Sequence, residues 1–310
     1  MNINQLNINF LGMGRAAMAL SIILVLVSIG SFFVRGLNFG IDFTGGTLIE
    51  VRYEQAADLS AIRDALASGG YPDAQVQLFG STRDVMIRIA PREGLESAAI
   101  SEEVMRILRA EGAQVSLQRV EFVGPQVGEE LATQGLWAVI WVSFGILVYI
   151  WFRFSGWQLA VNSVIALIHD VIVTVGFFSV FQWDFDLTVL AAVMAAAGYS
   201  LNDSIVVFDR IRENFLRIRK AMPWDIINGA INQTLSRTII TSGSTLAVVV
   251  VLFLIGGDTL RGFSLALIIG IIVGTYSSIF VGSYLAYLMG VDKTTFIIPE
   301  KEGAELDQRP

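Results

Sequence analysis

The stretch AAAGYSLNDSIVVFDRIREN, residues 195–214, decides the fold because it places a carboxylate inside an apolar helix. It begins with small residues and ends in a cluster of charges, and Asp203 lies between apolar neighbours on both sides. A charge inside a membrane helix costs about 2.5–3.5 kcal/mol on insertion scales, so it usually faces a bundle interior or a water path. Five residues share its face at helical spacing: Ala192, Ala195, Ala196, Ser200 and Asp203. The stretch therefore predicts an acid on a small-residue face, where Asp203 either titrates or only pairs with a neighbouring helix.

The composition of the whole chain is that of a membrane protein. Of its 310 residues, 54% are hydrophobic and 16% are charged, whereas soluble domains have about 25% charged residues. The chain has no cysteine, which excludes disulfides and thiolate metal sites, and its single histidine, His169, excludes a site built from several histidines. No hydrolase or nucleotide-binding motif is present. We therefore do not expect an enzyme, and we expect no cofactor and no metal.

Six apolar runs are long enough to cross a membrane. The first lies between Arg15 and Arg35, and no small-residue cleavage site follows it, so we expect a retained helix and not a signal peptide. The expected spans are residues 16–34, 136–152, 159–181, 187–208, 238–255 and 263–289. The loop 153–157 is very short, which predicts a helical hairpin between the second and third spans.

The distribution of charge orients these spans. The connection 209–237 is rich in basic residues, which places it in the cytoplasm by the positive-inside rule. Counting crossings backward puts the amino terminus of the segment 1–35 in the cytoplasm and residues 36–134 outside. The spans 135–289 then end in a polar cytoplasmic tail, residues 290–310.

Residues 36–134 form a segment of different character. They carry eight basic and fifteen acidic side chains, a difference equal to the net charge of −7 of the whole chain, and this acidity disfavours nucleic acid as a partner. Apolar spacing predicts strands at 47–53, 74–79, 85–89 and 115–123, helices at 59–67 and 98–108, and a hairpin turn at 80–83. The order βαββαβ is that of the ferredoxin-like motif. We therefore expect a polytopic α-helical membrane protein with six transmembrane helices and a ferredoxin-like external domain.

A glycine-rich segment, GIDFTGG, lies just outside the first span. It comprises Gly40, Ile41, Asp42, Phe43, Thr44, Gly45 and Gly46. The glycine pair permits a tight turn with positive φ, and no lysine follows that would make a phosphate-binding loop. From the residues alone, this segment predicts a structural turn that leads into the first strand.

Polar residues also interrupt the third and fifth spans. His169 and Asp170 lie near the middle of the span 159–181, where the histidine is either a hydrogen-bonded packing residue or a proton carrier. Arg237 begins the fifth span, and Thr241, Ser244 and Thr245 follow it on one face. Such a hydroxyl stripe either bridges helices or lines a thread of water.

Asp203 and Arg237 are expected to lie at comparable depth. Asp203 is 16 residues past Leu187, or about 24 Å along its helix, and Arg237 begins its span on the same side of the membrane. The two form either a coupled pair in proton transfer or a permanent salt bridge that holds two helices together.

The last span carries small residues at steps of four, namely Gly270, Gly274, Ser278 and Gly282. This is a helix-packing pattern, with no chemistry assigned to it. We expect this face, and the face of Ala192 and Ala196, to be covered and not to contact lipid.

These motifs together resemble the SecF family, whose members pair with SecD in the bacterial protein-export complex. The resemblance rests on GIDFTGG, on His169-Asp170, on residues 198–214 and on Ser236-Arg237-Thr238, and it extends over residues 15–289. Within residues 198–214 the family motif includes Gly198, Asn202, Asp209 and Arg210. The resemblance implies one six-helix half of a resistance-nodulation-division transporter in the bacterial inner membrane, with a periplasmic domain between its first two helices.

The resemblance also implies a function and partners. SecD supplies the other half of an obligate heterodimer, and the complex uses the proton motive force to help exported chains leave the SecYEG channel. YajC, the exported preprotein and membrane lipids are the further partners that it implies. The implied proton pathway comprises Asp203, Arg237, His169 and Asp170. Two other functions stay open: a half-transporter of the same superfamily for a lipid or small molecule, and a passive scaffold that stabilises a translocon.

Overall fold

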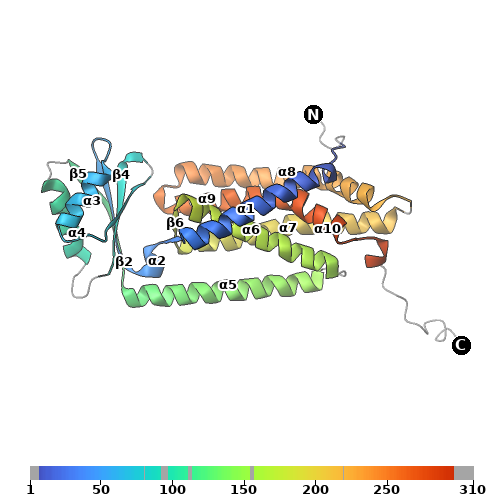
Figure 1. Ribbon diagram of the computed structural model, residues 1–310, viewed down its shortest axis with the longest axis horizontal. Helices are drawn as coiled ribbons and strands as arrows, with labels where there is room; N and C mark the ends of the chain where they lie inside the picture. The colour runs from blue at the N-terminus through green and yellow to red at the C-terminus, as the bar shows by residue number, and fades with distance from the viewer. Residues whose placement is uncertain are drawn as a thin grey trace.

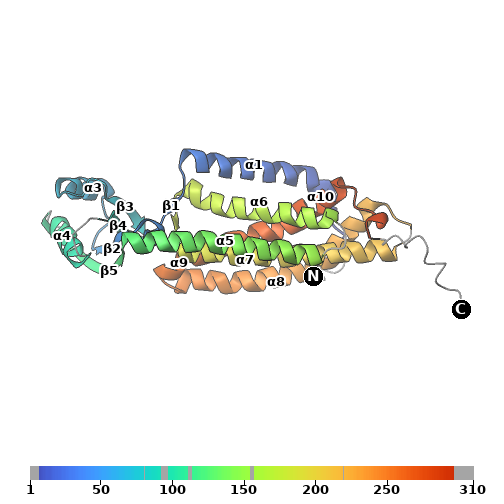
Figure 2. The same cartoon turned by 90° about the horizontal axis from the view of Figure 1, so that it is seen from below.

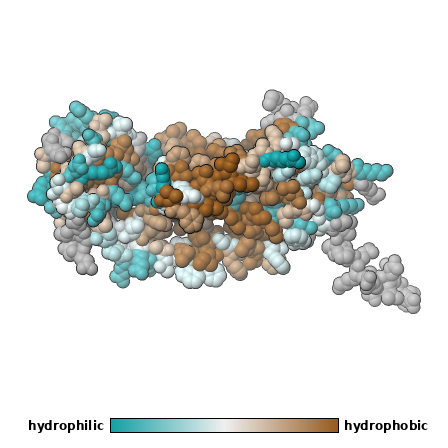
Figure 3. All heavy atoms as spheres, in the orientation of Figure 1, coloured by the Kyte–Doolittle hydropathy of each residue, from teal (hydrophilic) through white to brown (hydrophobic). Residues whose placement is uncertain are grey.

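The computed structural model describes residues 7–79, 81–91, 97–110, 114–153, 157–218 and 220–296. In this part of the chain six helices are long and apolar enough to cross a membrane. They form an elongated bundle with a small sheet domain at one end (Figure 1). Figure 3 shows a band of hydrophobic residues over the bundle, between two more hydrophilic ends. The prediction of a polytopic α-helical membrane protein with a sheet-containing domain is therefore confirmed.

The bundle is built around two central helices that pack along each other, α7 and α9. Its long helices are α1 (Gly14–Val34), α5 (Pro125–Arg153), α6 (Trp157–Phe181), α7 (Leu187–Arg217), α8 (Pro223–Ile255) and α9 (Asp258–Tyr276). A π-helical turn (Ser277–Gly282) joins α9 to α10 (Ser283–Leu288). Figure 2 shows α1 beside α6 on one flank of the bundle and α8 on the other. By contrast, most side chains of α5 are exposed.

Several helices extend beyond the spans expected from hydropathy. The connection 209–237 is not a loop, because α7 continues to Arg217 and α8 begins at Pro223, a residue suited to the first helical position. The extension of α7 is amphipathic: Ile211 and Phe215 are buried, while Glu213 forms ion pairs on its exposed side. Helix α5 likewise begins inside the segment 36–134. The loop residues 154–156 and the tail beyond residue 296 lie outside the described residues.

The sheet domain has four antiparallel strands in the order β3-β4-β2-β5. Its elements are β2 (Gly46–Tyr53), α3 (Leu59–Ser68), β3 (Gln75–Phe79), β4 (Ser81–Ile89), α4 (Ser97–Ala110) and β5 (Val115–Val123). The predicted βαββαβ order is confirmed, and β3 and β4 form the predicted hairpin. Its turn does not span residues 80–83 as expected, because β4 already begins at Ser81. Ile49, Ile87 and Val104 are fully buried between the helices and one face of the sheet. The other face of the sheet carries neither helix and lies toward the bundle (Figure 1).

A short parallel pair of strands joins the domain to the bundle. Strand β1 (Asn38–Phe39) follows α1, and it pairs with β6 (Asp184–Phe185), which directly precedes α7. Phe39 and Phe43 both contact the ring of Phe185, so aromatic packing surrounds this pair. The chain that leads into the sheet domain is thereby attached to the amino-terminal end of the central helix α7.

Candidate functional site

Asp203 lies on α7 with its side chain inside the bundle. Only 3% of the residue is exposed, and the hydroxyl of Ser242 on α8 donates a hydrogen bond of 3.1 Å to Asp203 Oδ2. Thr275 on α9 in turn donates to Ser242 Oγ at 2.9 Å. The predicted burial of this acid is therefore present in the structure, and hydroxyl groups from two neighbouring helices lie around it.

Asp170 is a second buried carboxylate, on α6 and 3% exposed. Its Oδ2 accepts hydrogen bonds from Ser200 on α7 and, at 2.7 Å, from Ser277 in the π-helical turn. Its Oδ1 lies 2.8 Å from His169 Nδ1. The other ring nitrogen, His169 Nε2, is buried and has no hydrogen-bond partner among the described residues. The histidine thus has one ring nitrogen in contact with a carboxylate and one without a partner among the described residues.

The end of α9 connects the surroundings of the two acids. Thr275 reaches the Ser242–Asp203 group, and Ser277, two residues later, reaches Asp170. The π-helical turn begins at Ser277, and its last carbonyl, that of Gly282, accepts a hydrogen bond of 2.6 Å from Asn162 on α6. Single π-helical turns are frequent at functional sites because they change the direction of side chains within a helix. Two groups of hydrogen-bonded polar side chains, drawn together from four helices, therefore lie inside an otherwise apolar bundle.

Arg237 does not contact Asp203. Its side chain is exposed, and no ion pair joins the two residues within the described part of the chain, although the arginine charge lies within electrostatic range. The permanent salt bridge considered above is therefore absent here. The polar stripe was also misplaced, since Ser244 is exposed and Thr241 and Thr245 are only half-buried. The buried hydroxyls of α8 are those of Thr234, Thr238 and Ser242.

The small residues of the last span face α7. A methyl group added at Gly270 would lie 2.5 Å from Ala196 Cβ, and one added at Gly274 would lie 2.7 Å from Ser200 Cβ. Gly282 lies against the ring of Phe208, and Ser278 is fully buried. The two small-residue faces thus cover each other within one chain, and no second subunit is needed to cover them.

Other motif residues of α7 lie on its outer surface. Ala195, Gly198 and Asn202 are exposed, so Ala195 does not share the buried face of Asp203 as its spacing suggested. At the far end of the helix, Asp209 forms an ion pair with Arg153 of α5. The neighbouring Arg210 forms an ion pair with Glu213, at 2.9 Å.

The GIDFTGG segment connects α7 to the sheet. Gly40 N donates to the Phe185 carbonyl at 2.9 Å, and Asp42 Oδ2 accepts a hydrogen bond from the first amide of α7, that of Leu187. Ile41 to Thr44 form a single helical turn, α2 (Ile41–Thr44), in which Thr44 Oγ1 donates to the Gly40 carbonyl. Gly45 and Gly46 then have φ values of +68° and +120°, which side chains rarely adopt. The segment is a structural turn that also caps the central helix.

Two family models match the chain. The model described as "Protein export membrane protein SecD/SecF, C-terminal" covers residues 103–292, and the "SecD/SecF GG Motif" covers residues 30–57. The protein translocase subunit SecF of Vibrio alginolyticus is 48% identical over 98% of this chain and 97% of its own length. This chain belongs to the SecF family. The match to the second model contains the whole GIDFTGG segment.

Two solved SecDF structures resemble this member of the SecF family. The SecDF of Thermus thermophilus, described as a translocon-associated membrane protein, gives a TM-score of 0.83 at 37% identity over 94% of this chain. SecDF in a super-membrane-facing form gives 0.66, also at 37% identity, over 92% of this chain. The chain spans 40% of the first SecDF chain and 39% of the second. In both of those proteins, more than half of the chain therefore lies outside the part that resembles this one.

Sequence reasoning missed the hydroxyl partners of the two acids in this SecF-family chain. Ser242, Thr275 and Ser277 are ordinary residues of apolar helices, and only the packing of α8 and α9 on α7 brings them to the carboxylates. A search at steps of four from Thr238, in place of Arg237, would have placed Ser242 on the buried face. No group of three or more metal-binding side chains exists among the described residues.

Proposed function

We propose that this chain pairs with a SecD subunit in the bacterial inner membrane and couples proton movement to protein export through SecYEG. Both termini lie in the cytoplasm and the sheet domain lies in the periplasm, where it assists release of the exported preprotein. YajC and membrane lipids are its further partners. The observation that carries this proposal is the buried Asp203, which is held by the Ser242 hydroxyl and by no contacting cation among the described residues.

Asp203 is the proposed proton-binding group. A carboxyl group away from water can gain or lose a proton near neutral pH, whereas arginine stays charged. An arginine that approaches the acid favours its ionised form, and one that withdraws lets it take up a proton. Because Arg237 lies within electrostatic range but out of contact, a small change in helix packing is sufficient to alter this balance.

His169 and Asp170 form the second part of the proposed proton pathway. Near the end of α9, Thr275 donates to the Ser242 hydroxyl that holds Asp203, and Ser277, at the start of the π-helical turn, donates to Asp170. A hydroxyl both donates and accepts hydrogen bonds. Protons can therefore move between the two acids along hydroxyls and intervening water. The buried, unpartnered His169 Nε2 provides a further position for a proton on this route.

A partner subunit is supported by the outer surface of α7 and α8. Asn202 and Arg237 are exposed on helices that span the membrane, and an amide or a guanidinium facing hydrocarbon is costly. Ala195 and Gly198 lie on the same exposed side of α7 and permit close approach of another helix. We assign this surface to the SecD half of the complex.

A half-transporter for lipids or small molecules is less well supported. A large apolar cleft in the external domain would favour it, but the cavity beside that domain is lined by charges of both signs, among them Glu50, Arg88 and Asp184. An experiment is needed to decide whether the chain is a passive scaffold or a proton-coupled subunit.

The deciding experiment is Asp203→Asn, which keeps size and hydrogen bonding but cannot titrate. In vesicles with SecD and SecYEG, we expect a stably assembled complex that has lost the dependence of export on the proton gradient. Asp225→Asn, an exposed acid in the first turn of α8, is the matched control and is expected to export normally. Wild-type export by Asp203→Asn, with wild-type dependence on the gradient, would make the chain a scaffold.

A further inference from the structure

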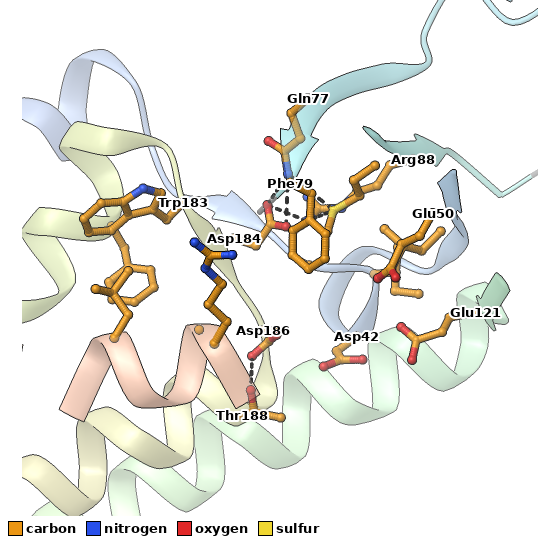
Figure 4. Close-up of a pocket in the computed structure, with 18 of the residues that line it drawn as sticks. Asp42, Glu50, Gln77, Phe79, Arg88, Glu121, Trp183, Asp184, Asp186 and Thr188 are labelled. Carbon is orange, nitrogen blue, oxygen red and sulfur yellow. Dashed lines mark hydrogen bonds and ion pairs between the residues drawn. The ribbon is translucent and has the colours of Figure 1, made fainter. Parts of the chain in front are cut away.

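Asp184 is the meeting point of three parts of the molecule. It lies on β6, two residues before the cap of α7, and one of its carboxylate oxygens accepts from three donors, of which Figure 4 labels Gln77 and Arg88. These are Arg88 Nη2 on β4 at 2.5 Å, Asn38 Nδ2 on β1 at 2.7 Å and Gln77 Nε2 on β3 at 2.8 Å. Two of the donors belong to the sheet, so the carboxylate ties the sheet domain directly to the bundle.

Arg88 makes this link specific. It is 8% exposed and lies on the helix-free face of the sheet, where its second terminal nitrogen donates to Asn38 Oδ1 and to the Phe39 carbonyl, both at 3.1 Å. Removing a guanidinium and a carboxylate from water is costly, so a buried ion pair is a poor source of stability. Its fixed geometry holds strand β4 in one position relative to β6.

Apolar packing at this junction is interrupted by a cavity. A cavity of about 530 Å³ separates the sheet from the bundle, bounded by Leu48 and Met86 of the sheet and by Phe178, Phe253 and Leu265 of the helices. Close-packed interiors have few voids larger than a water molecule. The position of the sheet relative to the bundle therefore depends on these polar links together with the aromatic contacts around β1 and β6, and the cavity leaves room for the domain to shift.

The helix that follows Asp184 in the chain, α7, carries the proposed proton-binding residue Asp203. Helix α7 is continuous from Leu187 through Asp203 to Arg217, and Leu187 is about 24 Å from Asp203 along the axis. A continuous helix moves as a unit over this length. A shift or rotation of α7 at Asp203 therefore moves Asp184, and Arg88 with it.

We propose that the Arg88–Asp184 ion pair transmits movement of α7 to the sheet domain. The proposal rests on the proposed function of Asp203, and it makes both residues positioning residues that bind neither proton nor substrate. Two related SecDF structures that match this chain at the same identity give TM-scores of 0.83 and 0.66. These two structures therefore differ in how closely their arrangement matches that of this chain.

The test separates proton movement from export. Arg88→Gln is compared with Arg52→Gln, which breaks the other 2.5 Å ion pair of the same sheet, with Asp84, at a largely exposed site away from the bundle. Both variants are reconstituted with SecD and SecYEG, and proton uptake and gradient-dependent export are measured. We expect Arg88→Gln to keep proton uptake within about twofold and to lose at least tenfold in export. Arg52→Gln is expected to change neither.

A covalent link provides the second measurement. Because the chain has no cysteine, Gln77→Cys with Asp184→Cys can be bridged selectively by a short bifunctional thiol reagent. We expect export to be low before bridging and to recover after it. If Arg88→Gln fails to assemble, this double-cysteine variant still tests whether the link between the sheet and β6 is required for export.

The outcomes distinguish this inference from the proposed function. Wild-type export by Arg88→Gln overturns the inference, as does equal loss of proton uptake and export, which would indicate damage to the bundle. Absence of recovery in a bridged protein also overturns it. If Asp203→Asn exports normally, the proposed function itself fails, whatever Arg88→Gln does.

Discussion

Ser242 of α8 donates a hydrogen bond of 3.1 Å to Asp203 of α7, so a hydroxyl and not an arginine holds the buried carboxylate. Arg237 lies five residues earlier on the same helix and is exposed. A hydroxyl can donate to an ionised carboxylate and can accept from a protonated one. The contact therefore persists in both states of the acid, whereas an ion pair would have to break at every proton uptake.

We predict that Ser242→Ala lowers gradient-dependent export by about tenfold without loss of assembly. Hydrogen bonds to charged groups contribute about 1.5–3 kcal/mol, and about 1.4 kcal/mol corresponds to a factor of ten in rate. Ser244→Ala, on the exposed side of α8, is the matched control and is expected to have no effect. Equal export by the two variants would show that the hydroxyl is not part of proton transfer.

Gly274→Ala is predicted to destabilise the bundle, by about 1–3 kcal/mol. The added methyl group would lie 2.7 Å from Ser200 Cβ, so α9 must move away from α7. Thermal unfolding of the purified protein in detergent measures this effect as a lower midpoint. Gly243→Ala is the control, because nothing lies within 4 Å of that position and alanine favours a helix by up to about 1 kcal/mol. An unchanged midpoint for Gly274→Ala would contradict the close packing of the two helices.

The elements of this protein were predictable because their signals are local. Alternation gave the strand at 115–123 with both of its ends, and hydropathy gave a helix at each of the six spans. Helix ends beyond the membrane were missed, since residues 209–217 are amphipathic and polar enough to be taken for a loop. A hydropathy window detects only the part of a helix that is apolar all round.

The buried polar site was predictable only where a residue type is unusual for a membrane helix. An acid in an apolar helix is conspicuous, so Asp203 and Asp170 were found, and both are buried. Their partners are serines and threonines, which are common in membrane helices and are identified by packing alone. The hydrogen bonds and ion pair of Asp184 were missed for the same reason, because the donors come from three separate parts of the chain.

The sheet domain, residues 46–123, is predicted to fold by itself. Its core residues, such as Ile49, Ile87 and Val104, contact one another within the domain, and the link to the bundle is mainly polar. Circular dichroism of the purified fragment is expected to show mixed helix and strand with a cooperative thermal transition. A disordered spectrum would mean that the bundle is needed to support the sheet.

Acid is predicted to weaken that domain through Asp84. The hydrogen bond from the Arg52 guanidinium holds the pKa of the Asp84 carboxyl below its ordinary value of 3.8. A group whose pKa is lower in the folded state stabilises the fold above its unfolded pKa, and this contribution is lost as pH falls through the folded pKa. In urea unfolding of the fragment, Asp84→Asn should therefore be less stable than wild type at pH 7, and the difference should vanish well below pH 3.8. A difference that is independent of pH would assign the effect to packing.

Asn202 is predicted to lie at the contact with the SecD half. An amide exposed on a membrane-spanning helix lacks hydrogen-bond partners in lipid, whereas a neighbouring helix can supply them. A spin label at Asn202→Cys should be shielded from dissolved oxygen in the assembled complex and become accessible when this chain is reconstituted without SecD. Leu26→Cys, at a residue of α1 that is 63% exposed and on the opposite flank of the bundle, should be accessible in both preparations. If the label at position 202 is as accessible as the one at position 26 in the complex, the partner subunit binds elsewhere and the amide faces lipid.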